Sequence, residues 1–197
     1  METTDLLVRV KDATRMQHQR LESLLPLSSE RLTLESYREL LVAFFGLFRL
    51  IETAVGRVHF PEELELPRRR RSQLLQRDLL ALGLSEQEIN RLPCPLDMPS
   101  ITGSASALGA MYVLEGSTLG GQYVAKIVHD RLQLNEQTGC SFFSSHGQDV
   151  GSMWRKFCAF VRQNVVAPEA QEQFVASAQS TFAAFENWVA RKDVSIA

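Results

Sequence analysis

An imidazole followed one helical turn later by a carboxylate is the first group in this sequence that could bind a metal. His18 interrupts the apolar face of a predicted helix, and Glu22 follows four residues later. At that spacing both side chains lie on one helix face. The carboxylate can bind the ring nitrogen that faces away from a metal, which fixes the tautomer and raises ligand basicity. The alternatives are a core histidine with satisfied hydrogen bonds, or ordinary pairing on a helix surface.

A stripe of glycines marks the second stretch of interest, residues 108–122. Its apolar residues predict a helix, yet each glycine costs about 1 kcal/mol relative to alanine in a helix interior. Three of the glycines share a narrow arc at about 100° per residue, and a neighbouring pair permits a bend. The pattern indicates either close helix packing or a flat ligand lying against the backbone. These glycines are Gly109, Gly116, Gly120 and Gly121.

Helical periodicity extends over most of the chain, and strand alternation is nowhere convincing. We therefore expect an all-α fold, a multi-helix bundle that forms one domain over residues 1–197. Thr3 or Thr4 is the candidate N-cap of the first helix. The predicted helices span residues 4–24, 33–58, 68–82, 104–132, 153–165 and 168–191, with a short helix after Ser85 and a polar, mobile connector over residues 135–151.

Composition narrows the classes of function. With 197 residues, 45% hydrophobic and 22% charged, the chain can bury one sizeable core. A net charge of −2 gives no basic field for nucleic acid. The first residues lack the features of a signal peptide, and no apolar run is long enough to span a membrane, so we expect a cytoplasmic protein. The three cysteines lack metal-ligand spacing, which favours reduced thiols.

Other metal and charge patterns are weak. The sequence has no His-x-x-x-His or Glu-x-x-His pair, so zinc and di-iron sites have no support. His59, His129 and His146 are expected at the surface. The arginine run 68–71 is interpreted as a solvated face or, alternatively, as a docking patch for an acidic electron donor.

Two motifs resemble those of the heme oxygenase family, in particular the bacterial biliverdin-producing enzymes associated with bacteriophytochromes. Residues Ala13–Glu22 look like the proximal helix that carries the iron-binding histidine. Residues Tyr112–Gln122 resemble the kinked, glycine-rich distal helix. The order and separation of the motifs and the chain length also fit the family.

The resemblance assigns roles to residues. It makes His18 the axial iron ligand and Glu22 the carboxylate that orients it. Ser117 stands where mammalian enzymes have an aspartate that organises distal water, and related bacterial members also have serine there. Arg155, Lys156 and Arg162 are candidates for further basic contacts to heme. The resemblance places Gly116, Ser117, Gly120 and Gly121 over the heme, Lys11 and Lys126 at the propionates, and Tyr112 at the propionates or the pocket wall.

The implied activity is O₂- and reductant-dependent cleavage of heme to biliverdin, CO and ferrous iron. Electrons would come from an external reductase of the ferredoxin or flavin type. The product would supply the bilin chromophore of a bacteriophytochrome, or the reaction would release iron, and the protein would be a monomer. One alternative is a non-catalytic heme- or tetrapyrrole-binding protein of the same fold. Another is a helical bundle without heme, in which the glycine stripe serves packing.

Overall fold

The computed structural model describes residues 5–27 and 32–191, and all regular structure in these ranges is helical, as the sequence predicts. None of the helices in these ranges is long and apolar enough to cross a membrane. The α-helices are α1 (Leu6–Leu24), α2 (Leu34–Val55), α3 (Ser72–Ala81), α4 (Glu86–Arg91), α5 (Ser104–Ser117), α6 (Gly121–Leu132), α7 (Val150–Asn164) and α8 (Pro168–Val189); the 3-10 helices are η1 (Glu62–Leu64), η2 (Leu66–Arg69), η3 (Thr118–Gly120) and η4 (Gly147–Asp149).

The core is built around α2, whose residues 40–48 are all buried. A helix that is apolar all round must be covered on every side. α3 packs on α2, and α8 approaches it from another side, where Trp188 Nε1 donates to the carbonyl oxygen of Ala43 at 3.0 Å. The Thr33 hydroxyl accepts from the Ser36 amide at 3.1 Å and so caps α2 at the residue where the second helix is predicted to start.

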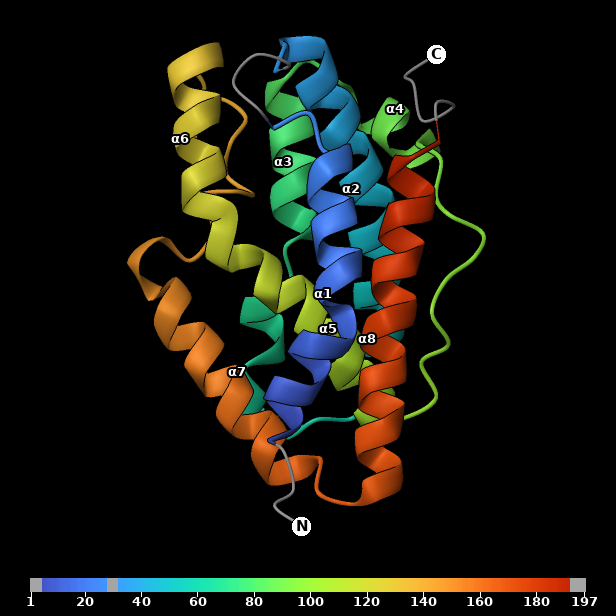
Figure 1. Ribbon diagram of the computed structural model, residues 1–197. Coiled ribbons are helices and arrows are strands. Elements are labelled where there is room, and N and C mark those ends of the chain that lie inside the picture. The colour runs from blue at the N-terminus through green and yellow to red at the C-terminus, as the bar shows by residue number, and fades with distance from the viewer. Residues whose placement is uncertain (1–4, 28–31, 192–197) are drawn as a thin grey trace.

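The last helix, α8, supports both α1 and α5. α1 and α8 run side by side in the same direction (Figure 1), and Gln17 Nε2 donates to the Gln179 carbonyl at 2.9 Å. α5 packs against α8 at Gly109, where a Cβ atom would overlap the Phe174 carbonyl oxygen and lie 2.9 Å from Ser177 Cβ. Helix packing therefore requires a glycine at position 109.

The predicted helix over residues 104–132 bends where its neighbouring glycines lie. α5 ends at Ser117, η3 follows, and α6 begins at Gly121 in a new direction (Figure 1). A Cβ on Gly121 would lie 2.6 Å from the Phe143 carbonyl oxygen, so this glycine lets α6 start close to the loop that follows it. We call residues 115–121 the kink.

The loop over residues 133–149 departs from the predicted polar connector. Residues 135–138 are exposed, but residues 139–143 are buried. The carboxylate of Asp78 on α3 accepts from the Ser141 amide and hydroxyl, both at 2.7 Å, and from the Phe142 amide at 2.8 Å. Burial raises the pKa of Asp78, and these hydrogen bonds oppose that rise. A buried carboxylate thus fixes the loop.

Several helix ends differ from the predictions. α2 stops at Val55 rather than at residue 58, and α3 begins at Ser72 because the chain forms η1 and η2 first. Thr3 and Thr4 lie outside the described residues, and Asp5 caps α1 by accepting from the Leu7 amide at 2.7 Å. Gly83, with φ of +96°, follows the end of α3 and takes the left-handed backbone that glycine favours there.

We expect Asp78→Asn to lower the free energy of unfolding by about 1–3 kcal/mol. Both carboxylate oxygens accept from backbone N–H groups, so either orientation of the amide would place its NH₂ against a donor. Urea denaturation measures the change. Asp97→Asn, at an exposed position, is the matched control, and equal stability of the two variants would contradict the role given to Asp78.

Candidate functional site

His18 lies on α1 with its ring open to solvent. Its Nδ1 is 3.4 Å from Glu22 Oε2, and the two side chains are 55% and 65% exposed. The ring packs edge-on against Phe182 of α8, with centroids 5.8 Å apart. No described residue hydrogen-bonds to Nε2. His18 is therefore not a core histidine, and its free nitrogen is available to a ligand.

The glycine stripe divides into two kinds of position. Gly109 and Gly121 are fixed by backbone atoms of neighbouring segments, as described above. At Gly120 an added Cβ would meet no heavy atom within 4 Å, and at Gly116 it would meet only the edge of the Trp154 ring at 3.9 Å. Packing thus explains two of the glycines and leaves the other two as open backbone.

Ser117 ends α5 between the two open glycines. Its hydroxyl donates to the Leu114 carbonyl oxygen at 2.7 Å and accepts from Arg71 Nη2 at 3.2 Å. A hydroxyl has one donor and two acceptor lone pairs. The hydrogen of Ser117 is therefore occupied, and one lone pair is free.

The arginine run 68–71 is neither a solvated face nor a docking patch as a whole. Arg68 and Arg70 are exposed, whereas Arg69 is 5% exposed and Arg71 is 2% exposed. Arg69 Nη1 donates to Glu115 Oε2 at 2.5 Å, and its Nε donates to the Leu64 carbonyl at 2.6 Å. Burial raises the pKa of Glu115, and the two buried arginines oppose that rise. The run thus supplies a buried ionic cluster behind the kink.

Arg71 is the largest fully buried side chain among the described residues. Its Nη2 donates to the Leu114 carbonyl as well as to Ser117. The guanidinium lies 5.0 Å from the ring centroid of Phe48 and 5.1 Å from that of Phe142. Burial lowers its pKa, opposed by Glu115 and Glu52. Sequence reasoning missed this arginine; an acidic Glu115 inside an otherwise apolar helix was the signal that buried cations lie nearby.

Glu52 of α2 fixes the backbone that carries Arg71. Its Oε1 accepts from the Arg71 amide at 2.7 Å, and its Oε2 accepts from the Ser72 hydroxyl at 2.5 Å. These groups form the N-terminal end of α3, where a carboxylate is favoured by the exposed N–H groups and the helix dipole. The position of Arg71 is therefore set from both its backbone and its side chain.

Of the basic and aromatic candidates, the two lysines are exposed and the tyrosine is partly buried between aromatic rings. Lys11 is exposed on α1, and Lys126 on α6 is 2.5 Å from Asp130 one turn further on. Tyr112 packs between Trp154 and Phe174, with ring centroids 5.5 Å and 5.9 Å away. Burial raises its pKa to about 12, so the phenol stays protonated. Tyr112 is thus held among helices α5, α7 and α8.

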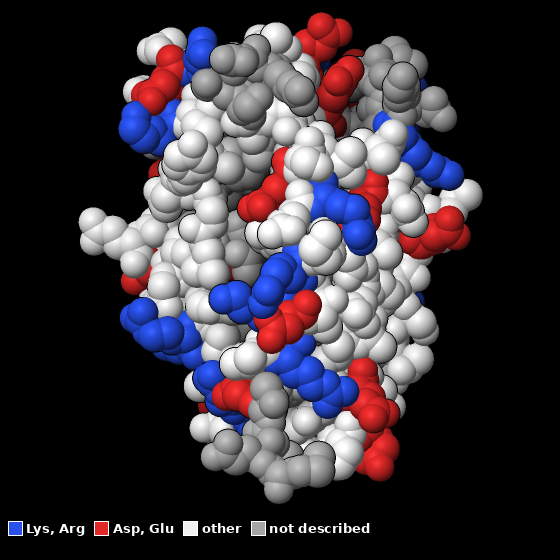
Figure 2. All heavy atoms as spheres, viewed as in Figure 1, with Lys and Arg blue, Asp and Glu red and all other residues white. Residues whose placement is uncertain are grey.

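The other basic candidates are less available. Lys156 pairs with Glu65 at 3.1 Å and Arg162 with Asp5 at 2.9 Å, while Arg155 is exposed. On the face that carries α1 and α7, Lys and Arg side chains alternate with Asp and Glu (Figure 2). This face offers no continuous basic patch.

The proximal and distal candidates lie in two groups. Within the described residues, no hydrogen bond, ion pair or ring contact joins His18, Glu22 or Lys11 to the kink. The His18 ring packs on α8, whereas Gly116 of the kink lies near Trp154 of α7. Exposed apolar side chains adjoin each group. Met16 is 62% exposed on α1, Leu119 is 50% exposed in the kink, and Tyr123 is 72% exposed on the first turn of α6. Open glycines, exposed apolar side chains and a free imidazole fit a flat apolar ligand that carries a metal.

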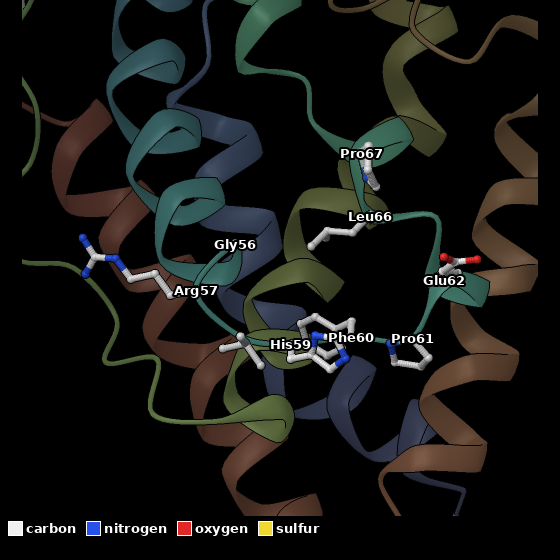
Figure 3. A pocket seen from close by; sticks show the side chains of 9 residues that line it. Gly56, Arg57, His59, Phe60, Pro61, Glu62, Leu66 and Pro67 are labelled. Atoms are coloured by element: carbon white, nitrogen blue, oxygen red, sulfur yellow. The ribbon is translucent and has the colours of Figure 1, made fainter.

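A cavity of about 630 Å³ lies elsewhere, at the end of α2 and the loop before η2. The side chains of His59, Phe60 and Pro61 lie together at its wall (Figure 3). It shares no residue with either group above. Among the described residues, no three His, Cys, Asp or Glu side chains are grouped so as to hold a metal ion.

Comparison with known proteins identifies the family of the chain. The family model described as heme oxygenase matches residues 4–191. A heme oxygenase from Xanthomonas campestris pv. campestris (strain 8004) is 31% identical over 125 residues, which are 62% of this chain and 68% of the relative.

Solved structures share the fold. The NO- and CO-bound heme oxygenase from Neisseria meningitidis has a TM-score of 0.75 and 22% identity, covering 95% of this chain and 91% of that chain. Heme oxygenase-1 from Synechocystis sp. PCC6803, solved in complex with heme, has a TM-score of 0.73 and 16% identity, covering 94% and 91%. With a family model that spans nearly all of its residues, the chain belongs to the heme oxygenase family, whose general activity is the cleavage of heme to biliverdin.

Proposed function

We propose that the chain binds heme between α1 and the kink and cleaves it to biliverdin, CO and ferrous iron. The observation that carries the proposal is the open backbone at Gly116 and Gly120, where no packing neighbour excludes a side chain. Each glycine costs helix stability, and a close approach by a flat ligand accounts for that cost. The exposed His18 supplies the metal ligand that such a site needs.

On the proximal side, His18 would hold the heme iron through Nε2. Glu22 faces Nδ1, so it favours the tautomer with the proton on Nδ1 and leaves the Nε2 lone pair for the metal. Phe182 supports the ring edge-on and limits its rotation. The protein thus presents one imidazole nitrogen to the ligand from the proximal side.

On the distal side, Gly116 and Gly120 would let the backbone contact the macrocycle without a side chain above the iron. Ser117 offers one free lone pair, to which an ordered water can donate. Gly121 would act indirectly, because it allows α6 to start against the loop. Bound heme supplies the iron at which O₂ is activated and the ring carbon that is oxidised.

Anchoring of the propionates is assigned to the exposed lysines. Lys11 lies seven residues before His18 on the unbroken helix α1, which places it about 10 Å along the axis. Lys126 would exchange the Asp130 carboxylate for a propionate. Tyr112, enclosed by Trp154 and Phe174, suits the pocket wall better than a propionate contact.

The partners and setting remain predictions from sequence and resemblance. The electron donor is expected to be a ferredoxin or a flavin-type reductase. Biliverdin would pass to a bacteriophytochrome, or the reaction would serve iron release. The protein is expected to be a cytoplasmic monomer with one domain over residues 1–197.

Titration with hemin followed by reduction in air tests the activity. We expect a saturable Soret band that decays under ascorbate or a reductase system with release of CO. His18→Ala should weaken hemin binding at least about tenfold, because the axial bond is lost. His59→Ala, at an exposed histidine outside the site, is the control.

Three results would contradict parts of this proposal. A Soret band that persists under reduction would leave a non-catalytic heme-binding protein. An unchanged spectrum in His18→Ala would overturn the proximal assignment. No band at all would mean that this site does not bind heme.

A pair of glycine variants separates ligand space from packing. We expect Gly120→Leu to keep or raise the melting temperature of the ligand-free protein, because its backbone has φ of −86° and the position is open. The same variant should weaken hemin binding sharply, because the side chain occupies ligand space. Gly121→Ala should lower the melting temperature instead, since its Cβ would lie 2.6 Å from a carbonyl oxygen. Unchanged hemin affinity in Gly120→Leu would remove the distal assignment.

A further inference from the structure

We propose that Gln179 of α8 is a positioning residue for the heme ligand: together with Gln17 it holds α1 against α8 and so fixes the place of the His18 imidazole. The inference rests on the proposed role of His18 as the axial ligand. Gln179 lies outside both sequence motifs, on a helix that the motifs do not include.

Apolar burial fixes only the first half of α1. The buried side chains of this helix are those of Leu6, Val10 and Thr14. In residues 15–24, all of which the structure describes, no side chain is buried. A helix in a globular protein is normally held in place by the burial of an apolar face. The half of α1 that carries His18 therefore depends on other contacts.

Two reciprocal hydrogen bonds between α1 and α8 supply such contacts. Gln17 Nε2 donates to the Gln179 carbonyl oxygen at 2.9 Å, and Gln179 Nε2 donates to the Ala13 carbonyl oxygen at 3.2 Å. A carbonyl oxygen has two lone pairs, so each acceptor can keep its helical hydrogen bond as well. We call this pair of bonds the glutamine clamp. Because both acceptors are backbone atoms, the clamp opposes sliding and rotation of α1 as a whole.

The His18 ring lies between the glutamine clamp and a second attachment of α1 to α8 (Figure 1). Phe182, which packs edge-on against the imidazole with centroids 5.8 Å apart, follows Gln179 by three residues. Glu186 follows Phe182 by four residues, and its Oε2 accepts from Arg20 Nε at 3.2 Å. Residues three and four apart share a helix face. One face of α8 therefore holds α1 on both sides of the heme ligand.

Overall stability does not account for the glutamine clamp. Gln179 is exposed and Gln17 is half-buried, so water can bind both amides when the helices are apart. The net stabilisation from such bonds is small, and ordering two long side chains costs conformational entropy. A metal ligand, by contrast, has to be held within about 0.5 Å of its working position. Precise placement of α1 is the effect for which the clamp is suited.

Amide hydrogen exchange in the ligand-free protein tests the clamp. Gln179→Met removes the donor and keeps the length of the side chain. Gln173→Met is the matched control, because Gln173 is an exposed glutamine of the same helix that lies on another face at about 100° per residue. We expect exchange in residues 15–24 to become about three- to tenfold faster in Gln179→Met alone. Exchange in residues 6–14 and the melting temperature should stay near the values of the unsubstituted protein.

Two measurements on the hemin complex separate positioning of His18 from a merely looser helix. The iron–histidine stretching band of the reduced complex, seen by resonance Raman scattering, should shift or broaden in Gln179→Met and not in Gln173→Met. Transfer of hemin to a heme-free globin should be about three- to tenfold faster in Gln179→Met. Gln179→Lys restores a donor of similar reach, so it should bring exchange, band and transfer rate back towards the unsubstituted values.

Three outcomes would overturn the proposal. Unchanged exchange in Gln179→Met would mean that the clamp does not hold α1. Faster exchange with an unchanged band and transfer rate would mean that the clamp does not position His18. Equal effects in Gln173→Met would show that they do not depend on the clamp. If Gln179→Met fails to fold, Gln17→Met removes the other bond of the clamp, and the same expectations apply.

Failure of the proposed function would be recognised separately from failure of the clamp. The unsubstituted protein would then form no Soret band with hemin, while exchange in the ligand-free variants would still report whether Gln179 holds α1.

Discussion

The site depends on one buried ion pair, between Arg69 of η2 and Glu115 of α5. The two side chains are 2% and 3% exposed, and removing one partner of such a pair leaves an uncompensated charge that costs about 3–5 kcal/mol. Glu115 directly precedes the first open glycine, so the pair joins the C-terminal end of α5 to η2. Glu52 of α2 also holds the backbone at the start of α3. The kink is therefore fixed on its buried side by α2 and by the segment that precedes α3.

Because these contacts are on the buried side of the kink, its other side remains open. Gly109 makes the close contact with α8, and Gly121 makes the close contact with the loop at Phe143. Gly116 and Gly120 are not required for packing. The imidazole of His18 is supported in a similar way, from α8 through Phe182, and its free nitrogen faces solvent. Each half of the proposed heme site is thus rigid on one side and open on the other.

The sequence was sufficient to predict features that depend only on residues within one helix. The spacing of His18 and Glu22, the start of the second helix at Thr33 and the bend at the glycine pair are all properties of single helices, and the structure confirms them. The sequence could not assign separate roles to Gly109 and Gly120, because both lie on one stripe and differ only in what packs against them. Nor could it divide the arginine run, since the burial of Arg69 and Arg71 depends on a carboxylate 46 residues beyond Arg69.

The pairing of α1 with α8 has a consequence for how the chain folds during synthesis. Gln179 Nε2 donates to the Ala13 carbonyl, a contact that spans 166 residues. The face of α1 that packs on α8 therefore stays uncovered until α8 has left the ribosome. Folding dominated by such long-range contacts is slow, and apolar surface exposed meanwhile is prone to aggregation. Helix α1, which carries His18, is thus synthesised well before the helix that covers it, and we expect nascent chains to need chaperone protection until α8 has emerged.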